Sequence, residues 1–225
     1  IQKVPYVYTK ERRKFWDVGR TLRQNLSISG GDARSDFFLG VNYIDQTGVL
    51  PGDKKNQASL LLNTGRQMGK FEVRLTLGYA RGNMNQGPPN MGIDLTPAHI
   101  PLTRYKDYNN DHWSDQNHYY SDYVLNPYHS LGISRKKTAA NALFGNLELK
   151  YKPLEWLTIK NRLGINYLGS NAKTFNEPVY FSDFARFNGL VRFRDIDASV
   201  REEMNTQASI NQDLIFQTSN KWGFY

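Results

Sequence analysis

Apolar and polar residues alternate along several segments of the chain, which is the pattern of a β-strand with one apolar face. In the clearest segment, Lys70 to Arg81, the odd-numbered positions from 71 to 79 are apolar and the even-numbered positions are polar or small. The alternation recurs with interruptions in six more segments: 22–28, 37–43, 58–64, 143–151, 157–167 and 208–216. Asn161 and Gln212 are the two polar interruptions of the apolar face in the last two segments. All nine prolines lie outside the seven segments, as expected of hydrogen-bonded strands.

The connections between these segments alternate in length. Short turns at 30–35, 65–69, 153–156 and 217–221 separate longer connections at 47–56, 82–141 and 168–204. Outer-membrane barrels have short periplasmic turns and long extracellular loops, whereas a soluble sandwich has no reason to place all its long loops at one end. The sequence therefore predicts an all-β fold, a transmembrane antiparallel β-barrel.

The predicted barrel segment divides into alternating groups of strands and loops. We expect an extracellular loop at 1–21, four strands within 22–81, a long extracellular loop at 82–141, a hairpin at 142–167, another extracellular loop at 168–204, and a strand with the start of the next at 205–225. The predicted lipid-facing residues are Phe71, Val73, Leu75, Leu77, Tyr79, Leu147, Leu149, Leu163 and Ile165. Aromatic residues mark both ends of the predicted strands, as expected of interfacial belts: Tyr43, Tyr79 and Tyr167 at the outer end, and Phe37, Phe71, Tyr151 and Trp156 at the periplasmic end.

The composition agrees with this class of protein. Hydrophobic residues make up 39% of the chain and mean hydropathy is −0.64, yet aromatic residues reach 13%. No apolar run approaches the length of a membrane-spanning helix, and Ile1 to Pro5 does not resemble a signal peptide. The net charge of +8 is spread along the chain, so no nucleic-acid partner is expected. There is no cysteine, and no catalytic pairing of side chains emerges, which predicts a protein that is not an enzyme.

Several motifs of the chain form a distinctive series. They begin at Phe15-Trp16-Asp17-Val18-Gly19-Arg20-Thr21 and Asn25-Leu26-Ser27-Ile28-Ser29-Gly30-Gly31, and continue with 37–50, which contains Tyr43-Ile44-Asp45-Gln46-Thr47-Gly48. The series ends with Asn126-Pro127-Tyr128, residues 145–151 and Trp156-Leu157-Thr158-Ile159. Together these motifs resemble the barrel of SusC/RagA-type TonB-dependent transporters, from about residue 15 to about residue 170. The glycine pair at 30–31 is expected to supply positive-φ positions for a tight periplasmic turn.

The resemblance implies a barrel of about twenty-two strands with an N-terminal plug, located in the bacterial outer membrane. This chain would supply seven to eight of those strands, without the plug or the segment that contacts TonB. It further implies import of oligosaccharides or peptides with energy relayed by the TonB complex. The implied partners are a SusD-like surface lipoprotein acting as a lid, the TonB complex, and outer-membrane lipid including lipopolysaccharide.

Three alternatives stay open at the level of sequence. The chain could form a closed eight-stranded barrel, whose lumen would be filled with side chains. It could be a soluble carbohydrate-binding β domain, with the apolar face as an inner core. It could also belong to a surface adhesin or a structural outer-membrane barrel.

The long loop at 82–141 holds the candidate binding residues. Its aromatic side chains offer flat amphipathic surfaces for a substrate or for the lid lipoprotein: Tyr105, Tyr108, Trp113, Tyr119, Tyr120 and Tyr123. Packing of the loop on itself is the alternative reading of the same residues. Four arginines of the next loop, Arg186, Arg192, Arg194 and Arg201, are candidates for anionic substrate or lipopolysaccharide phosphates, against a simply solvated surface.

Metal sites are weakly indicated. Asp107, Asn109 and Asp111 have the spacing of the start of a calcium loop, but His112 occupies the position of the glycine that makes its sharp turn. The four histidines, His99, His112, His118 and His129, have no recognisable metal-ligand spacing and are expected to be solvated. No cofactor is expected, apart from this possible structural calcium ion.

Overall fold

The computed structural model describes residues 10–89, 91–97, 99–121, 124–188 and 194–219. Seven strands form one antiparallel sheet in sequence order. The strands are β1 (Arg20–Gly31), β2 (Ser35–Thr47), β3 (Lys54–Met68), β4 (Phe71–Gln86), β5 (Ser134–Leu154), β6 (Leu157–Asn176) and β7 (Ser199–Thr218). The helices are short and all lie in the connections: α1 (Lys10–Arg13), η1 (Ile93–Leu95), η2 (Leu102–Tyr105), α2 (Pro127–Ile133) and α3 (Asp183–Asn188). The all-β prediction is confirmed.

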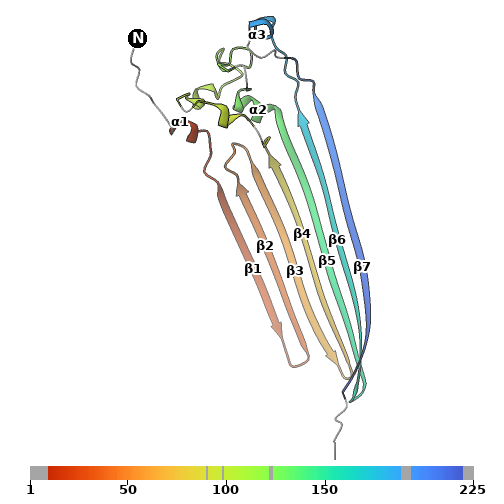
Figure 1. Cartoon of the computed structure of the whole chain (residues 1–225). Helices are drawn as coiled ribbons and strands as arrows, with labels where there is room; N and C mark the ends of the chain where they lie inside the picture. The colour runs from red at the N-terminus through yellow and green to blue at the C-terminus, as the bar shows by residue number, and fades with distance from the viewer. Residues whose placement is uncertain (1–9, 90, 98, 122–123, 189–193, 220–225) are drawn as a thin grey trace, which may run out of the picture.

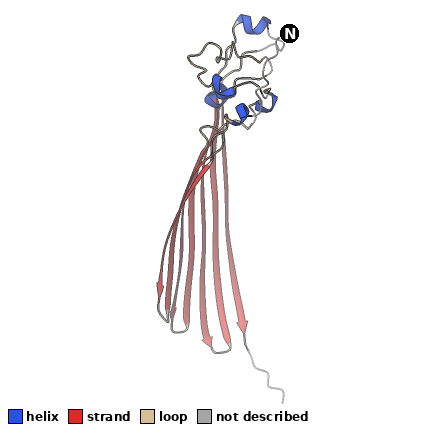
Figure 2. Ribbon diagram, turned by 90° about the vertical axis from the view of Figure 1, so that its left-hand side faces the viewer, coloured by secondary structure: helices blue, strands red, loops and turns tan. Residues whose placement is uncertain are grey.

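The long connections gather at one end of the sheet and the tight turns at the other (Figures 1 and 2). We call the described residues of 10–19, 87–133 and 177–198 the loop layer, and the opposite end the turn end. No helix in the described residues is long and apolar enough to cross a membrane. β1 and β7 each pair on one side only within the described residues, so the described sheet is open.

The first tight turn depends on Asp32 and not on left-handed glycines, which corrects the sequence expectation. Gly30 and Gly31 belong to β1, and neither has a positive φ. The Asp32 carboxylate instead accepts the backbone N–H groups of Arg34 at 2.7 Å and Ser35 at 2.8 Å. Gly31 is required because a Cβ there would meet the Ser35 carbonyl oxygen at 2.5 Å. These two N–H donors also hold the pKa of Asp32 below its ordinary value.

The register puts the predicted apolar residues of neighbouring strands on one common face. Leu75 on β4 lies opposite Leu147 on β5, which lies opposite Leu163 on β6. The same face holds Phe71, Val73, Leu77, Tyr79, Leu149 and Ile165 in paired positions. We call it the apolar face. The opposite face is mostly polar or small, as in Thr76 opposite Asn146, and we call it the polar face.

Every strand is longer than the alternating segment that predicted it, and the extensions of four strands shorten the predicted long connections. β4 continues to Gln86 and β5 begins at Ser134, so the long connection is 87–133 and not 82–141. β6 continues to Asn176 and β7 begins at Ser199, which shortens the predicted connection at 168–204. These extensions are rich in Asn, Thr, Lys and Ala, so their alternation is invisible, although their backbone ladder continues. The start of a further strand expected near 221–225 lies outside the described residues.

The buried side chains lie in the loop layer and not on the sheet. One cluster contains Phe15, Met91, Ile93, Leu102, Tyr128 and Leu131, and a second contains Val179, Phe181 and Ala185. On the sheet, large apolar residues such as Leu149 and Ile210 are exposed. A sheet whose apolar face has no protein cover needs another apolar phase against it, which is what a lipid bilayer provides.

Candidate functional site

Asn126 is the polar centre of the loop layer and is fully buried. Its side-chain amide donates to the carbonyl oxygens of Tyr105 at 2.8 Å and Ser114 at 2.7 Å. Its side-chain oxygen accepts the N–H of Tyr128 at 3.0 Å and so caps the start of α2. Its own backbone N–H donates to Gln116 Oε1 at 3.0 Å. One side chain therefore ties together three turns of the long connection.

The residues that follow Asn126 anchor the long connection to the rest of the layer. Pro127 starts α2, where a missing N–H costs nothing. The Tyr128 ring packs on Phe15 with ring centroids 4.9 Å apart, and so joins the connection to the segment before β1. The Asn126-Pro127-Tyr128 motif was noticed in the sequence only as part of a resemblance, and the structure shows its physical role.

A second anchor links two connections, β2–β3 and β4–β5, at one end of the strands. Arg135 forms an ion pair with Asp53 at 2.9 Å and donates to the carbonyl oxygens of Leu131 and Pro51. Asp53 also accepts the N–H of Gly87 at 2.7 Å. Both charged side chains are largely buried, so this pair fixes the base of the loop layer to β3 and β5.

The predicted aromatic residues divide into an inner and an outer group. Tyr119 is 6% exposed and packs against Tyr105 and Tyr120, with ring centroids 5.0 and 4.6 Å away. Burial raises the pKa of Tyr119 and, to a lesser extent, that of Tyr105. Tyr108 packs against the first buried cluster and edge-on to His129. Tyr119 and Tyr108 therefore pack the loop on itself.

Trp113 and Tyr120 form the outer group, with exposed fractions of 67% and 38%. They border an open cleft of about 400 Å³ together with Tyr105, Arg104, Asp111 and His118. The cleft thus combines aromatic rings with both signs of charge. Tyr123, the remaining predicted residue, lies outside the described residues.

The structure gathers a different metal-ligand set from the one suggested by sequence. Donor atoms of His112, Asp115 and His118 all lie within 4.8 Å of one another, with His118 Nδ1 2.7 Å from Asp115. Two imidazoles and a carboxylate are a donor set that suits a transition-metal ion. Asp107 and Asp111, the calcium candidates, instead accept hydrogen bonds from Asn110 and Ser114 within their own turns, and Asn109 lies between them.

Sequence reasoning overlooked the aromatic residues of the second long connection. Tyr180, Phe184 and Phe187 are all exposed, around and on α3. This connection docks on the first one, because the N–H of Ser182 donates to Asn117 Oδ1 at 2.7 Å and the second buried cluster packs against Leu125 and Ile133. The sequence did hold a signal for these residues, because the second long connection is aromatic like the first. The emphasis on the arginines there was partly misplaced: Arg186 forms an ion pair with Asp195 at 2.6 Å, and Arg192 lies outside the described residues.

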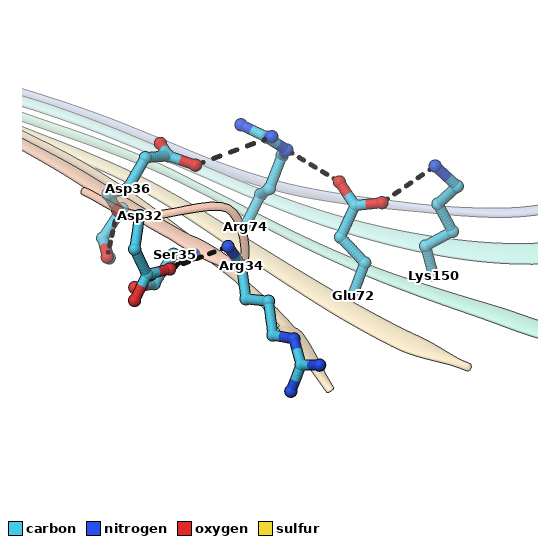
Figure 3. A network of polar contacts seen from close by, with 8 residues as sticks. Asp32, Arg34, Ser35, Asp36, Glu72, Arg74 and Lys150 are labelled. Carbon is cyan, nitrogen blue, oxygen red and sulfur yellow. Dashed lines mark hydrogen bonds and ion pairs between the residues drawn. The ribbon is translucent and has the colours of Figure 1, made fainter. Parts of the chain in front are cut away.

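The polar face carries a charged network near the turn end (Figure 3). Arg74 lies 2.9 Å from Glu72 and 3.7 Å from Asp36, and Lys150 lies 2.9 Å from Glu72. Arg74 reaches Asp36 across Gly65, where a Cβ would meet the Asp36 carboxylate at 2.9 Å. Arg162 and Glu148 continue the network at 2.6 Å. A hydrated lumen suits such a surface, whereas lipid excludes it.

Comparison with known proteins agrees with a sheet that has one apolar face and one polar face. No family model matches the sequence. The chain is 24% identical over 183 residues to "TonB-dependent receptor P39" of Formosa agariphila, a match that covers 78% of this chain and 17% of that protein. The chain therefore spans about a sixth of the length of this curated relative.

Two solved structures are similar to the chain to different degrees. The RagAB peptide importer in its "closed-closed" state matches with a TM-score of 0.58 and 17% identity, over 75% of this chain and 20% of that chain. The outer-membrane transporter YddB from Escherichia coli matches with a TM-score of 0.38 and 10% identity, over 85% of this chain and 25% of that chain. None of the three proteins is named as an enzyme.

The first solved structure supports the fold, and the curated relative supplies the sequence link. Both proteins belong to the outer membrane, which argues against the alternative of a soluble domain. Because outer-membrane barrels have long extracellular loops and short periplasmic turns, we propose that the loop layer lies outside the cell and the turn end in the periplasm. The chain therefore has the fold of part of an outer-membrane β-barrel, and its sequence is similar over most of its length to a TonB-dependent receptor.

Proposed function

We propose that the protein containing this wall imports oligosaccharides or peptides across the outer membrane. TonB supplies the energy, and a SusD-like lipoprotein acts as a lid over the loop layer. One observation supports this proposal. A structured loop layer rich in aromatic residues covers one end of a sheet whose polar face suits a hydrated lumen. Import needs such a surface for capture, whereas a purely structural barrel does not.

Within the loop layer, we assign first contact with substrate or lid to Trp113 and Tyr120. Both rings border the cleft and are exposed, whereas Tyr119 and Tyr108 are needed for packing. Arg104 and Asp111 in the same cleft add polar groups that can orient a peptide or a sugar. Large rings lose little side-chain entropy on binding, so two of them can act as anchors.

The test uses the full-length transporter in cells, with uptake of oligosaccharides and peptides and pull-down of the lid lipoprotein as readouts. Replacing Trp113 and Tyr120 with alanine should weaken capture by about 1–3 kcal/mol. Trp156→Ala is the control, because Trp156 is also exposed but lies at the turn end.

Unchanged uptake and unchanged lid binding in the Trp113/Tyr120 variant would contradict the assignment of the cleft. A full-length protein that binds the lid but takes up neither class of substrate, even with TonB intact, would contradict import itself. That result would favour an adhesin or a structural barrel.

A further inference from the structure

One cross-strand row on the apolar face is unusually basic. In the register of the sheet, one residue from each of the seven strands forms this row: Arg20, Thr47, Lys54, Asn85, Lys137, Lys173 and Glu202. It contains four cations and one anion. We call it the basic row, and its members come from strand segments of well-defined register.

The basic row lies beyond the aromatic belt, outside the hydrocarbon. Asn85 is three same-face positions past Tyr79 on β4, and Lys173 is three past Tyr167 on β6. That separation is about 20 Å along a strand. At a strand tilt of 35–45° it corresponds to roughly 14–16 Å of height above the belt. Lysine side chains are long enough to reach back toward the interface, so their ammonium groups cover the headgroup zone.

The charges of the basic row are only partly balanced by the protein. Lys173 pairs with Glu202 at 3.0 Å. Within the described residues, Lys54 and Lys137 form no ion pair, and the Lys137 ammonium group lies 5.4 Å from the centre of the Phe175 ring on the same face. On the polar face the opposite arrangement holds, because Asp36, Arg74, Glu148, Arg162 and Asp213 alternate in sign along one row. The basic row therefore has an excess of positive charge that this row of the polar face does not have.

The row also lines a hollow on the sheet. This open groove has a volume of about 670 Å³ and is bordered by Lys54, Lys137 and Lys173, with Asn56, Asn83 and Asn171 one position below. Asn85, between Lys54 and Lys137, has a buried side-chain oxygen with no hydrogen-bond partner in the described residues. Cations beside amide groups suit a ligand that carries both phosphates and hydroxyl groups.

We propose that the basic row binds the phosphate groups of lipopolysaccharide, the anionic glycolipid of the outer leaflet. Lys54 and Lys137 contact phosphate, while Asn85 accepts a hydrogen bond from a sugar hydroxyl. The site lies on the outer wall of the barrel, so it holds lipid around the transporter and is independent of the substrate pathway through the lumen.

The test measures binding of purified lipopolysaccharide to the full-length transporter in detergent, by native mass spectrometry. Lys54 and Lys137 are changed together to glutamine. Lys55 and Lys136, their neighbours in sequence, project from the polar face and provide a control pair with the same loss of charge. Folding of each variant is checked by heat-modifiable electrophoretic mobility.

The Lys54/Lys137 variant should bind the lipid about tenfold more weakly, and the Lys55/Lys136 variant should bind like the unmodified protein. Enzymatically dephosphorylated lipid should lose affinity for the unmodified protein, and an equal concentration of inorganic phosphate should not displace the intact lipid. The proposal is overturned by equal loss in both variants, by no loss in the Lys54/Lys137 variant, by full binding of dephosphorylated lipid, or by displacement with phosphate. Uptake is measured separately, so failure of this site leaves the import proposal intact.

Discussion

Gln212 on β7 donates a side-chain hydrogen bond to Asn161 on β6, with 3.4 Å between Nε2 and Oδ1. These residues are the two polar interruptions of the apolar face on the last two strands, and they satisfy each other. An amide that faces lipid without a partner is costly, which explains why two interruptions occur side by side.

This pairing predicts a coupled response to mutation. Asn161→Leu alone leaves the Gln212 amide unpaired, and Gln212→Leu alone leaves Asn161 unpaired, so the double variant should be more stable than the sum of the single effects. The coupling should be about 0.5–1.5 kcal/mol, measured by urea unfolding in lipid vesicles. Additive single effects would show that the hydrogen bond contributes nothing.

Asn126→Ala should loosen the loop layer without affecting the sheet. The change leaves the buried carbonyl groups of Tyr105 and Ser114 without their donor and removes the cap of α2, at a combined cost of about 2–4 kcal/mol. Hydrogen exchange should rise across 100–133 and stay unchanged in β2 and β3. Asn110→Ala, at an exposed turn position, is the control. Protection that stays unaltered in Asn126→Ala would remove this residue as the centre of the layer.

Acidification should loosen the same layer through His129. Burial lowers the pKa of His129 below its ordinary value, against the opposing effects of Glu177 and Asp115. The unfolded segment therefore binds a proton more readily than the folded one. The contribution of neutral His129 to the folding stability of the layer is fully present above about pH 6.5. It is lost as the pH falls through the lowered pKa of the folded state.

Protease sensitivity of the loop layer at pH 7.5 and pH 5.5 measures this effect. His129→Phe should reduce the difference between the two pH values, whereas a change at the exposed His112, for example His112→Gln, should preserve it. An unchanged difference in His129→Phe would assign the acid sensitivity to another group.

The direction of the strands predicts which positions can be reached from outside the cell. A single cysteine at Asn110 should react with an impermeant thiol reagent on intact cells, because this position is exposed in the loop layer. A cysteine at Gln67, beside the turn between β3 and β4, should react only after the outer membrane is opened. The reverse labelling pattern would invert the topology.

The sequence predicted the strands and their faces well where one face is apolar. There the two-residue period is readable, as in Phe71 to Tyr79, where each apolar side chain lies on the same face. Beyond the belt no apolar phase selects side chains, so segments such as 134–142 had no readable period although they are paired throughout.

The loop layer was less predictable. An aromatic residue in a long loop can be an anchor or a core residue, and only the fold separates Trp113 from Tyr119. The grouping of His112 with His118 depends on a turn that Asp115 caps by accepting the N–H groups of Asn117 and His118. The basic row was also invisible in sequence, because its members come from seven separate strands and are neighbours only in the register of the sheet.

The most direct measurement of the central claim is the effect of arginine at two adjacent positions of β4. Leu75 lies on the apolar face between Thr64 and Leu147, and Thr76 lies on the polar face between Asn63 and Asn146. Leu75→Arg should cost about 2–4 kcal/mol when the full-length protein is unfolded from vesicles, because it places a charge in the hydrocarbon. Thr76→Arg should be tolerated in the hydrated lumen. Equal destabilisation by both substitutions would mean that the sheet is buried on two sides, and would contradict its place in the wall of an outer-membrane barrel.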